Sequence, residues 1–116
     1  MNIKRGEIHL AALDPTLGRE ISKTRPVVIV SNDKNNAFSG TVTVLPISSQ
    51  NLDKVYPFEV FLSKGTGNLP KNSKVKADQI RTIDRARIIK PIGTLASATM
   101  EQVEKAIRLH LDLQEA

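Results

Sequence analysis

The chain has 116 residues, with 17 Lys and Arg against 12 Asp and Glu, so its net charge is +5. That length fits a single domain, residues 1–116, with a core of its own. Cysteine is absent, which excludes disulfides, thiolate metal sites and cysteine nucleophiles, and no apolar run approaches the ~20 residues of a membrane span.

No apolar stretch follows the charged N-terminus, so a signal peptide is not predicted and we expect a cytoplasmic protein without membrane contact. The segment from Ser97 onward carries −2, which leaves +7 on the rest of the chain. Such a basic surface is common in ordinary domains, and nucleic acid is its leading functional explanation. Only 3% of the residues are aromatic, which argues against modules that stack bases on aromatic platforms.

The first half of the chain predicts strands separated by polar turns. Glu7–Leu10 alternates polar and apolar residues and ends before Asp14-Pro15. Pro26–Ser31 is a β-branched run typical of a strand buried on both faces, and 32–36 is a polar turn. Thr41–Ser48 is a second such run, in which Pro46 predicts an edge or a bulge.

The second half predicts two more strands, a loop and a helix. Val55–Leu62 alternates, the Gly- and Pro-containing stretch 63–72 is a loop, and Ser73–Ile83 predicts a strand with no cleanly apolar side, typical of a strand near a site. The C-terminal segment has helical spacing at Met100, Val103, Ile107 and Leu111. Ser97 or Thr99 is the expected N-cap, with Thr99 and Gln102 as a capping box. The fold expected is a five- or six-stranded antiparallel-rich sheet or small barrel with one terminal helix.

Most catalytic signatures are missing from the chain. His9 and His110 are the only imidazoles, and a paired-histidine ribonuclease mechanism requires both in one cleft; otherwise their roles are structural. No carboxylate cluster has metal-ligand spacing, and Gly65–Asn68 lacks the lysine of a phosphate loop. We therefore expect neither a metal ion nor a cofactor.

Two basic segments are candidates for anion binding. Leu17–Pro26 carries Arg19, Lys23 and Arg25, and Pro26 holds Arg25 in extended backbone at the rim of a sheet, which suits a phosphate clamp. The alternative is an ordinary solvated loop.

The second segment, Asp78–Arg87, has three arginines for a phosphate backbone and Gln79 for a base edge. Its alternative is an exposed strand end with internal Asp–Arg pairs. The hydroxyls of Ser48 and Ser49 are weak evidence by themselves, since such pairs commonly cap turns.

Together these segments resemble the MazF/PemK/Kid family of toxin endoribonucleases. The matching stretches, in chain order, are Lys4–Ile8, Asp14-Pro15 with Gly18–Glu20, Thr24–Asp33, Leu69–Ser73 and Asp78–Asp84. An Arg-Pro before a β-branched run is weak alone, but the central motif at Thr24–Asp33 followed by the later one at this separation is specific.

The resemblance implies a mainly β fold with a C-terminal α-helix, a small SH3-like antiparallel barrel of the PemK/CcdB type. It also implies a homodimer that cleaves single-stranded RNA, mRNA included, at short sequences without a metal. The RNA's own 2′-OH attacks and leaves a 2′,3′-cyclic phosphate, and a cognate acidic antitoxin neutralises the toxin. The cleavage sequence and the antitoxin's identity stay open.

By the same resemblance the catalytic residues are Arg25 and the hydroxyl of Ser48, where the family commonly has threonine. Serine lacks the methyl group that restrains the rotamer, so the rate is open. Arginine is a poor base at neutral pH, and Glu20 is the nearest carboxylate in sequence. The predicted RNA contacts are Leu17, Arg19, Lys23, Asn32, Gln79, Arg81, Arg85 and Arg87.

Two other functions compete with the nuclease. A CcdB-like gyrase inhibitor of the same fold would not need the Arg25 and Ser48 pair. A plain nucleic-acid-binding module would bind with steep salt dependence and never cut.

Overall fold

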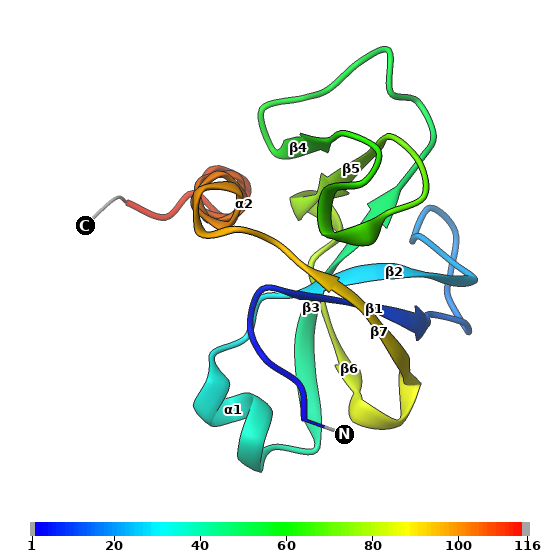
Figure 1. The fold of residues 1–116 in the computed structure, drawn as a ribbon, viewed down its shortest axis with the longest axis vertical. Coiled ribbons are helices and arrows are strands. Elements are labelled where there is room, and N and C mark those ends of the chain that lie inside the picture. Colours follow the sequence, from blue (N-terminus) through cyan, green and yellow to red (C-terminus); the bar gives the residue numbers. More distant parts are fainter. Residues whose placement is uncertain (1, 115–116) are drawn as a thin grey trace.

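The computed structural model describes residues 2–114, so Met1, Glu115 and Ala116 lie outside the described residues (Figure 1). Its strands are β1 (Glu7–Ala12), β2 (Thr24–Ile29), β3 (Thr41–Ser48), β4 (Glu59–Leu62), β5 (Ser73–Lys76), β6 (Arg81–Asp84) and β7 (Ile88–Thr94). The α-helices are α1 (Asp33–Phe38) and α2 (Ser97–Leu111), and short 3₁₀ turns occupy 66–68, 77–79 and 85–87. The expectation of an antiparallel sheet with a terminal helix is confirmed.

Strand β3 organises the sheet, because three other strands pair with it. The order of the sheet is β4-β5-β3-β2-β1-β7, and β6 pairs with β3 beside β5. Strand β6 covers the first half of β3, from Thr41 to Val44, while β5 covers Ile47 and Ser48. Strands β6 and β7 are consecutive but not paired, so the barrel is open between them.

Pro46 lies in a central strand rather than at an edge, which corrects the sequence prediction. It pairs with Val27 of β2 and falls where the other side of β3 changes partner from β6 to β5. A residue without an N–H is tolerated at such a gap in the ladder. Pro46 thus stands two residues before Ser48, at the point where β3 leaves the barrel.

The prediction of one strand over Ser73–Ile83 was wrong. Residues 77–79 form a 3₁₀ turn that separates β5 from β6, so the period-two alternation does not run through it. The turn lets the two strands cover different parts of β3, and it projects Asp78 and Gln79 from the sheet.

Four other predictions need correction. The polar stretch after β2 forms α1, capped by the Asn32 side chain, which accepts from the Asn35 amide. Strand β4 is shorter than predicted, and β7 was not predicted because Pro91 and Gly93 interrupt its pattern. Helix α2 has Ala96 as its N-cap, without a side-chain cap bond, so the proposed capping box is not formed.

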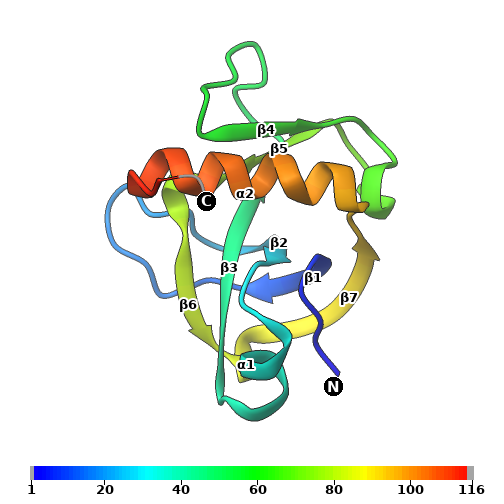
Figure 2. The same cartoon turned by 90° about the vertical axis from the view of Figure 1, so that its left-hand side faces the viewer.

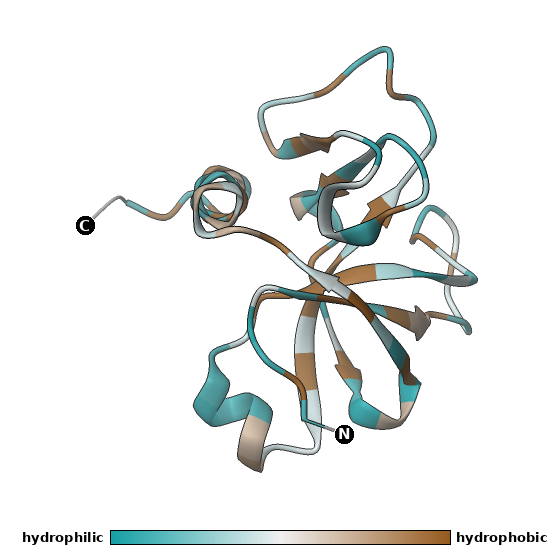
Figure 3. Cartoon of the chain, in the orientation of Figure 1, coloured by the Kyte–Doolittle hydropathy of each residue, from teal (hydrophilic) through white to brown (hydrophobic). Residues whose placement is uncertain are grey.

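The buried apolar residues form two clusters, which take alternate residues of β2 and so lie on opposite faces of that strand. Figure 3 shows that apolar residues recur along the strands that carry these clusters. One fills the barrel between β1, β2, β3, β6 and β7 and includes Val27, Ile29 and Val44. The other lies beneath α2, which crosses over β4 and β5 and buries Met100 and Val103 (Figure 2). Among residues 2–114, no helix is long and apolar enough to cross a membrane.

Candidate active site

Arg25 lies near the start of β2, and Ser48 is the last residue of β3. The β2–β3 ladder ends at the pair of Val27 and Pro46, so each of the two residues stands two positions beyond that end; Arg25 pairs there with Ala11 of β1. Arg25 is half-buried, and its Nε donates to the Ser22 carbonyl at 2.7 Å. This bond holds the side chain at the rim of the sheet and leaves the two terminal guanidinium nitrogens for an anion.

Ser48 is buried, and the Gln50 amide donates to its Oγ at 3.2 Å. The bond restrains the hydroxyl in the way that the missing methyl group of a threonine otherwise would. It also occupies a lone pair and leaves the O–H free to donate outward. On its other side Ser48 pairs with Lys74 of β5.

A cleft of about 400 Å³ gathers five of the predicted site residues, and Asp78 and Ile80 complete its lining. The five are Leu17, Arg19, Glu20, Gln79 and Arg81. The β1–β2 loop forms one wall, and the β5–β6 turn forms the other. The Ile21 amide donates to Gln79 Oε1 at 3.3 Å and ties the two walls together. Residues 58 positions apart in the chain thus form one surface.

Two polar atoms of this cleft are buried without a hydrogen-bond partner among the described residues, Asp78 Oδ1 and Arg81 Nη1. The nearest cation to Asp78 is Lys76, whose Nζ lies 3.9 Å from that oxygen. In the sequence Asp78 falls inside a predicted strand and has no role of its own; its position before Gln79 in a polar strand end was the available signal. A carboxylate and a guanidinium with unused capacity are both suited to bind a polar ligand.

A second cleft of about 370 Å³ adjoins the first, because Asp78 lines both. Its outer wall is the β3–β4 loop, in which the Tyr56 and Phe58 rings stack with centroids 5.4 Å apart. Lys54 Nζ lies 5.1 Å from the Tyr56 ring centroid. Its inner wall is the side chains of Lys74, Lys76 and Glu59. The two clefts therefore extend from the β1–β2 loop to the β3–β4 loop.

The remaining predicted contacts lie apart from this surface or have other partners. Asn32 caps α1 and lines a different cleft beside α2. Lys23 is exposed in the left-handed region at φ 71°. Arg85 donates to the Asn36 carbonyl, and Arg87 donates to the carbonyls of Ala12 and Asp14. These hydrogen bonds join separate segments of the barrel, and the expected part of the two arginines in RNA binding stays a prediction.

The two histidines are not brought together. His9 is 1% exposed in β1, and its Nε2 lies 3.0 Å from Glu7 Oε1. His110 lies on α2 with its ring edge toward Phe58. A paired-histidine mechanism is not supported by this arrangement.

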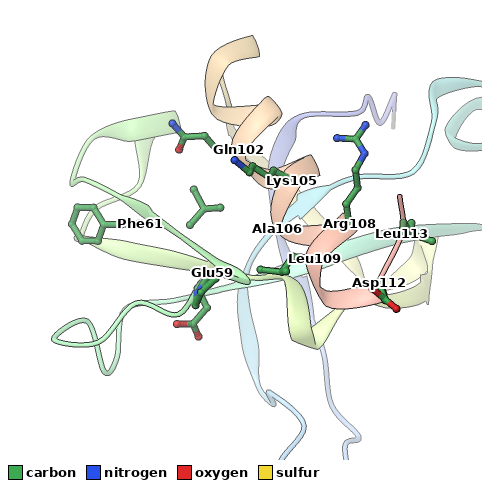
Figure 4. A pocket seen from close by; sticks show the side chains of 11 residues that line it. Glu59, Phe61, Gln102, Lys105, Ala106, Arg108, Leu109, Asp112 and Leu113 are labelled. Carbon is green, nitrogen blue, oxygen red and sulfur yellow. The ribbon is translucent and has the colours of Figure 1, made fainter. Parts of the chain in front are cut away.

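A groove of about 550 Å³ between β4 and α2 contains none of the predicted site residues (Figure 4). Ala106, Leu109 and Leu113 give it an apolar wall, while the Glu59 carboxylate points away from the helix. Among residues 2–114, no group of three or more His, Asp or Glu side chains is placed to hold a metal ion.

Comparison with known proteins identifies the family. Residues 4–111 match the family described as PemK-like, MazF-like toxin of type II toxin-antitoxin system. The chain belongs to this family. It is 45% identical over 116 residues to endoribonuclease MazF9 of Mycobacterium tuberculosis (strain ATCC 25618 / H37Rv), covering 96% of this chain and 98% of that one.

Solved structures extend the match to the fold. MazF from Deinococcus radiodurans superposes with a TM-score of 0.84 at 25% identity, over 97% of this chain and 98% of that one. The Mycobacterium tuberculosis toxin MazF-mt6 gives 0.80 at 28% identity, over 94% of this chain and 99% of that one. This PemK/MazF protein is an endoribonuclease toxin, and the alternative of a gyrase inhibitor is not favoured.

Proposed function

We propose that this PemK/MazF endoribonuclease cuts single-stranded RNA at a short sequence without a metal ion, by activating the RNA's own 2′-OH. The observation that carries the proposal is that Arg25 and Ser48 lie on neighbouring strands, each two residues beyond the last pair of the β2–β3 ladder, Val27 with Pro46. The cleft that contains Arg19 and Arg81 offers two guanidinium groups for phosphate contacts, beside the carboxylates of Glu20 and Asp78.

The reaction needs alignment and charge stabilisation from the protein. The 2′-oxygen attacks the adjacent phosphorus and loses its proton to a base. The bond from phosphorus to the 5′-oxygen breaks, and that oxygen takes a proton from solvent water as it leaves. Products are a 2′,3′-cyclic phosphate and a free 5′-OH. Arg25 neutralises the charge that grows on the phosphoryl oxygens, and the Ser48 hydroxyl donates to one of them.

The base is a carboxylate lining the Arg19 and Arg81 cleft. Glu20 Oε1 already accepts a hydrogen bond from the Leu17 amide at 2.7 Å, so this carboxylate stabilises the turn in which it lies. Asp78 Oδ1 accepts no hydrogen bond from the described residues. The free acceptor makes Asp78 the stronger candidate and leaves Glu20 a part in loop geometry.

Paired variants separate these two carboxylates. We expect Asp78→Asn to lower kcat by about 100-fold, as loss of a general base does, and Glu20→Gln to lower it by about threefold or less. Single-turnover cleavage of one RNA oligonucleotide by both variants checks this. The reverse order of the two losses would assign the proton transfer to Glu20 instead.

Cleavage in a chelator tests the proposed function directly. The purified chain is incubated with a long single-stranded RNA in EDTA, and the new ends are mapped and their termini identified by mass spectrometry. We expect cuts at a recurring short sequence with 2′,3′-cyclic phosphate ends. Cleavage that stops in EDTA, or an intact RNA alongside gyrase-dependent DNA breaks, would contradict the proposal.

We further propose that the toxin is a homodimer, acts in the cytoplasm where mRNA is present, and is neutralised by an acidic antitoxin. The mycobacterial endoribonuclease solved with its cognate antitoxin shares this fold. The net charge of +5 suits an acidic partner. Light scattering of the chain, alone and with the acidic product of a neighbouring reading frame, checks both associations.

A further inference from the structure

The network around Lys74 is the most buried set of charges in the described part of the chain. Lys74 Nζ donates to Glu59 Oε1 at 3.0 Å and to the carbonyls of Asn51 and Lys54 at 2.9 and 3.0 Å. The side chains of Lys74 and Glu59 are 4% and 0% exposed. All three N–H bonds of the ammonium are thus used, two of them on one loop.

Glu59 completes the network from the neighbouring strand. Its Oε1 also accepts from the Tyr56 amide at 3.0 Å, and its Oε2 accepts from Lys76 Nζ at 2.7 Å. Burial alone would raise the pKa of Glu59. The bonds from Lys76, the Tyr56 amide and Lys74 outweigh it and keep that pKa below its ordinary value. The carboxylate therefore stays ionised at neutral pH, and the network keeps its charges.

Stability alone does not account for this arrangement. Two buried charges lose their hydration, and apolar side chains of similar volume commonly fill such a position at equal or lower cost. The network also restrains the backbone of one loop, because three of its hydrogen bonds are made to backbone groups of residues 51–56. It fixes the β3–β4 loop to β4 and β5.

The fixed loop begins directly after Ser48. Lys74 is the β5 residue that pairs with Ser48, and its bond to the Asn51 carbonyl holds a turn in which Asn51 has a left-handed φ of 54°. The Gln50 amide, one residue before that turn, is the donor to Ser48 Oγ. A short path of contacts thus joins the Lys74 ammonium to the hydroxyl of the proposed active site.

We propose that Lys74, supported by Glu59, is a positioning residue for RNA cleavage. By holding the β3–β4 loop it places the Gln50 amide and so orients the Ser48 hydroxyl toward the phosphate. It also holds the outer wall of the cleft beside Asp78 in place. The inference rests on the proposed function, because it assigns Ser48 a part in the reaction.

Lys74→Met tests the proposal with little change in volume. Glu59 then keeps Lys76 and the Tyr56 amide, so no buried charge is left alone, and only the Asn51 and Lys54 carbonyls lose their donor. Lys71→Met is the matched control, since it removes the same charge from an exposed position two residues before the same strand. Both chains are compared with the parent on an oligonucleotide that carries a mapped cleavage site.

We expect Lys74→Met to lower kcat by between about tenfold and 100-fold with a smaller change in KM, because the loss is one of alignment. Amide hydrogen exchange should accelerate over residues 49–58, while Lys71→Met should match the parent in both measurements. Should Lys74→Met fail to fold, Glu59→Gln keeps the volume and the lysine and should show both changes in milder form.

Three outcomes would overturn the positioning role. One is a Lys74→Met chain with faster exchange in the loop but unchanged kcat, and another is a fall in kcat without faster exchange. The third is an equal fall in Lys71→Met, which would indicate a general charge effect. A parent chain that cuts no RNA contradicts the proposed function and this role with it, and the exchange data then report separately on the loop.

Discussion

Arg25→Ala is expected to remove RNA cleavage almost completely while the fold stays intact. The terminal nitrogens of the Arg25 guanidinium have no hydrogen-bond partner among the described residues, so they can neutralise a phosphoryl oxygen. Loss of one such donor lowers kcat by roughly 100- to 1000-fold in other enzymes. The side chain is half-buried, and its one hydrogen bond within residues 2–114 goes to the Ser22 carbonyl of its own loop, so we expect its removal to leave the barrel intact.

The measurement is single-turnover cleavage of an RNA oligonucleotide, with circular dichroism and thermal unfolding as checks on the fold. Lys90→Ala is the control, because it removes one positive charge from an exposed position of β7. It should reduce RNA affinity slightly and leave kcat unchanged. Cleavage that persists in purified Arg25→Ala protein would show that the activity comes from another site or from a contaminating nuclease.

Among glycine-to-alanine substitutions in this chain, Gly93→Ala is expected to lower the free energy of unfolding most. A Cβ at Gly93 would lie 2.2 Å from the Gly67 carbonyl oxygen, and backbone at such a distance has to move. Gly93 pairs with Ile8 of β1, so the strand itself would be displaced. We expect the free energy of unfolding to fall by about 3 kcal/mol and Tm by roughly 10 °C.

Gly40→Ala is the matched control for this change. Nothing lies within 4 Å of a Cβ at that position, and its φ is outside the left-handed region. Its unfolding free energy should stay within about 0.5 kcal/mol of the parent. Thermal and urea unfolding of the two variants measures the difference, and equal stabilities would mean that β7 does not approach the Gly67 turn as described.

Local sequence was a good guide where backbone chemistry decides the structure. Arg25 precedes a proline and a β-branched run, and it lies at the start of β2 as predicted. The terminal helix follows from its apolar spacing. Prediction failed where the structure of a segment depends on its pairing with neighbouring strands. Residues 73–83 alternate well enough for one strand, but the 3₁₀ turn at 77–79 is needed because β5 and β6 cover different parts of β3.

In the candidate site too, some features follow from the sequence and others only from the tertiary structure. The sequence identified the arginines, but their environments differ through contacts made by distant residues. Arg81 lines the cleft with an unpaired nitrogen among the described residues, whereas Arg87 is held by the carbonyls of Ala12 and Asp14. The sequence assigned no role to Lys74 or Asp78. Lys74 matters because it binds the Asn51 carbonyl, which is distant in the chain. Asp78 matters because its Oδ1 is buried without a hydrogen-bond partner among the described residues.

By itself the sequence determined the family, the strand-forming runs, the terminal helix and the residue types available for phosphate chemistry. Those properties depend on local backbone preference, on apolar spacing and on ordered motifs, all of which can be read along one chain. The tertiary structure alone decided which charges are free and which are occupied, because burial and hydrogen bonding depend on contacts between distant segments. It placed Arg25 and Ser48 just beyond the end of the β2–β3 ladder, left Asp78 Oδ1 without a hydrogen-bond donor among the described residues, and fixed the loop after Ser48 to Lys74.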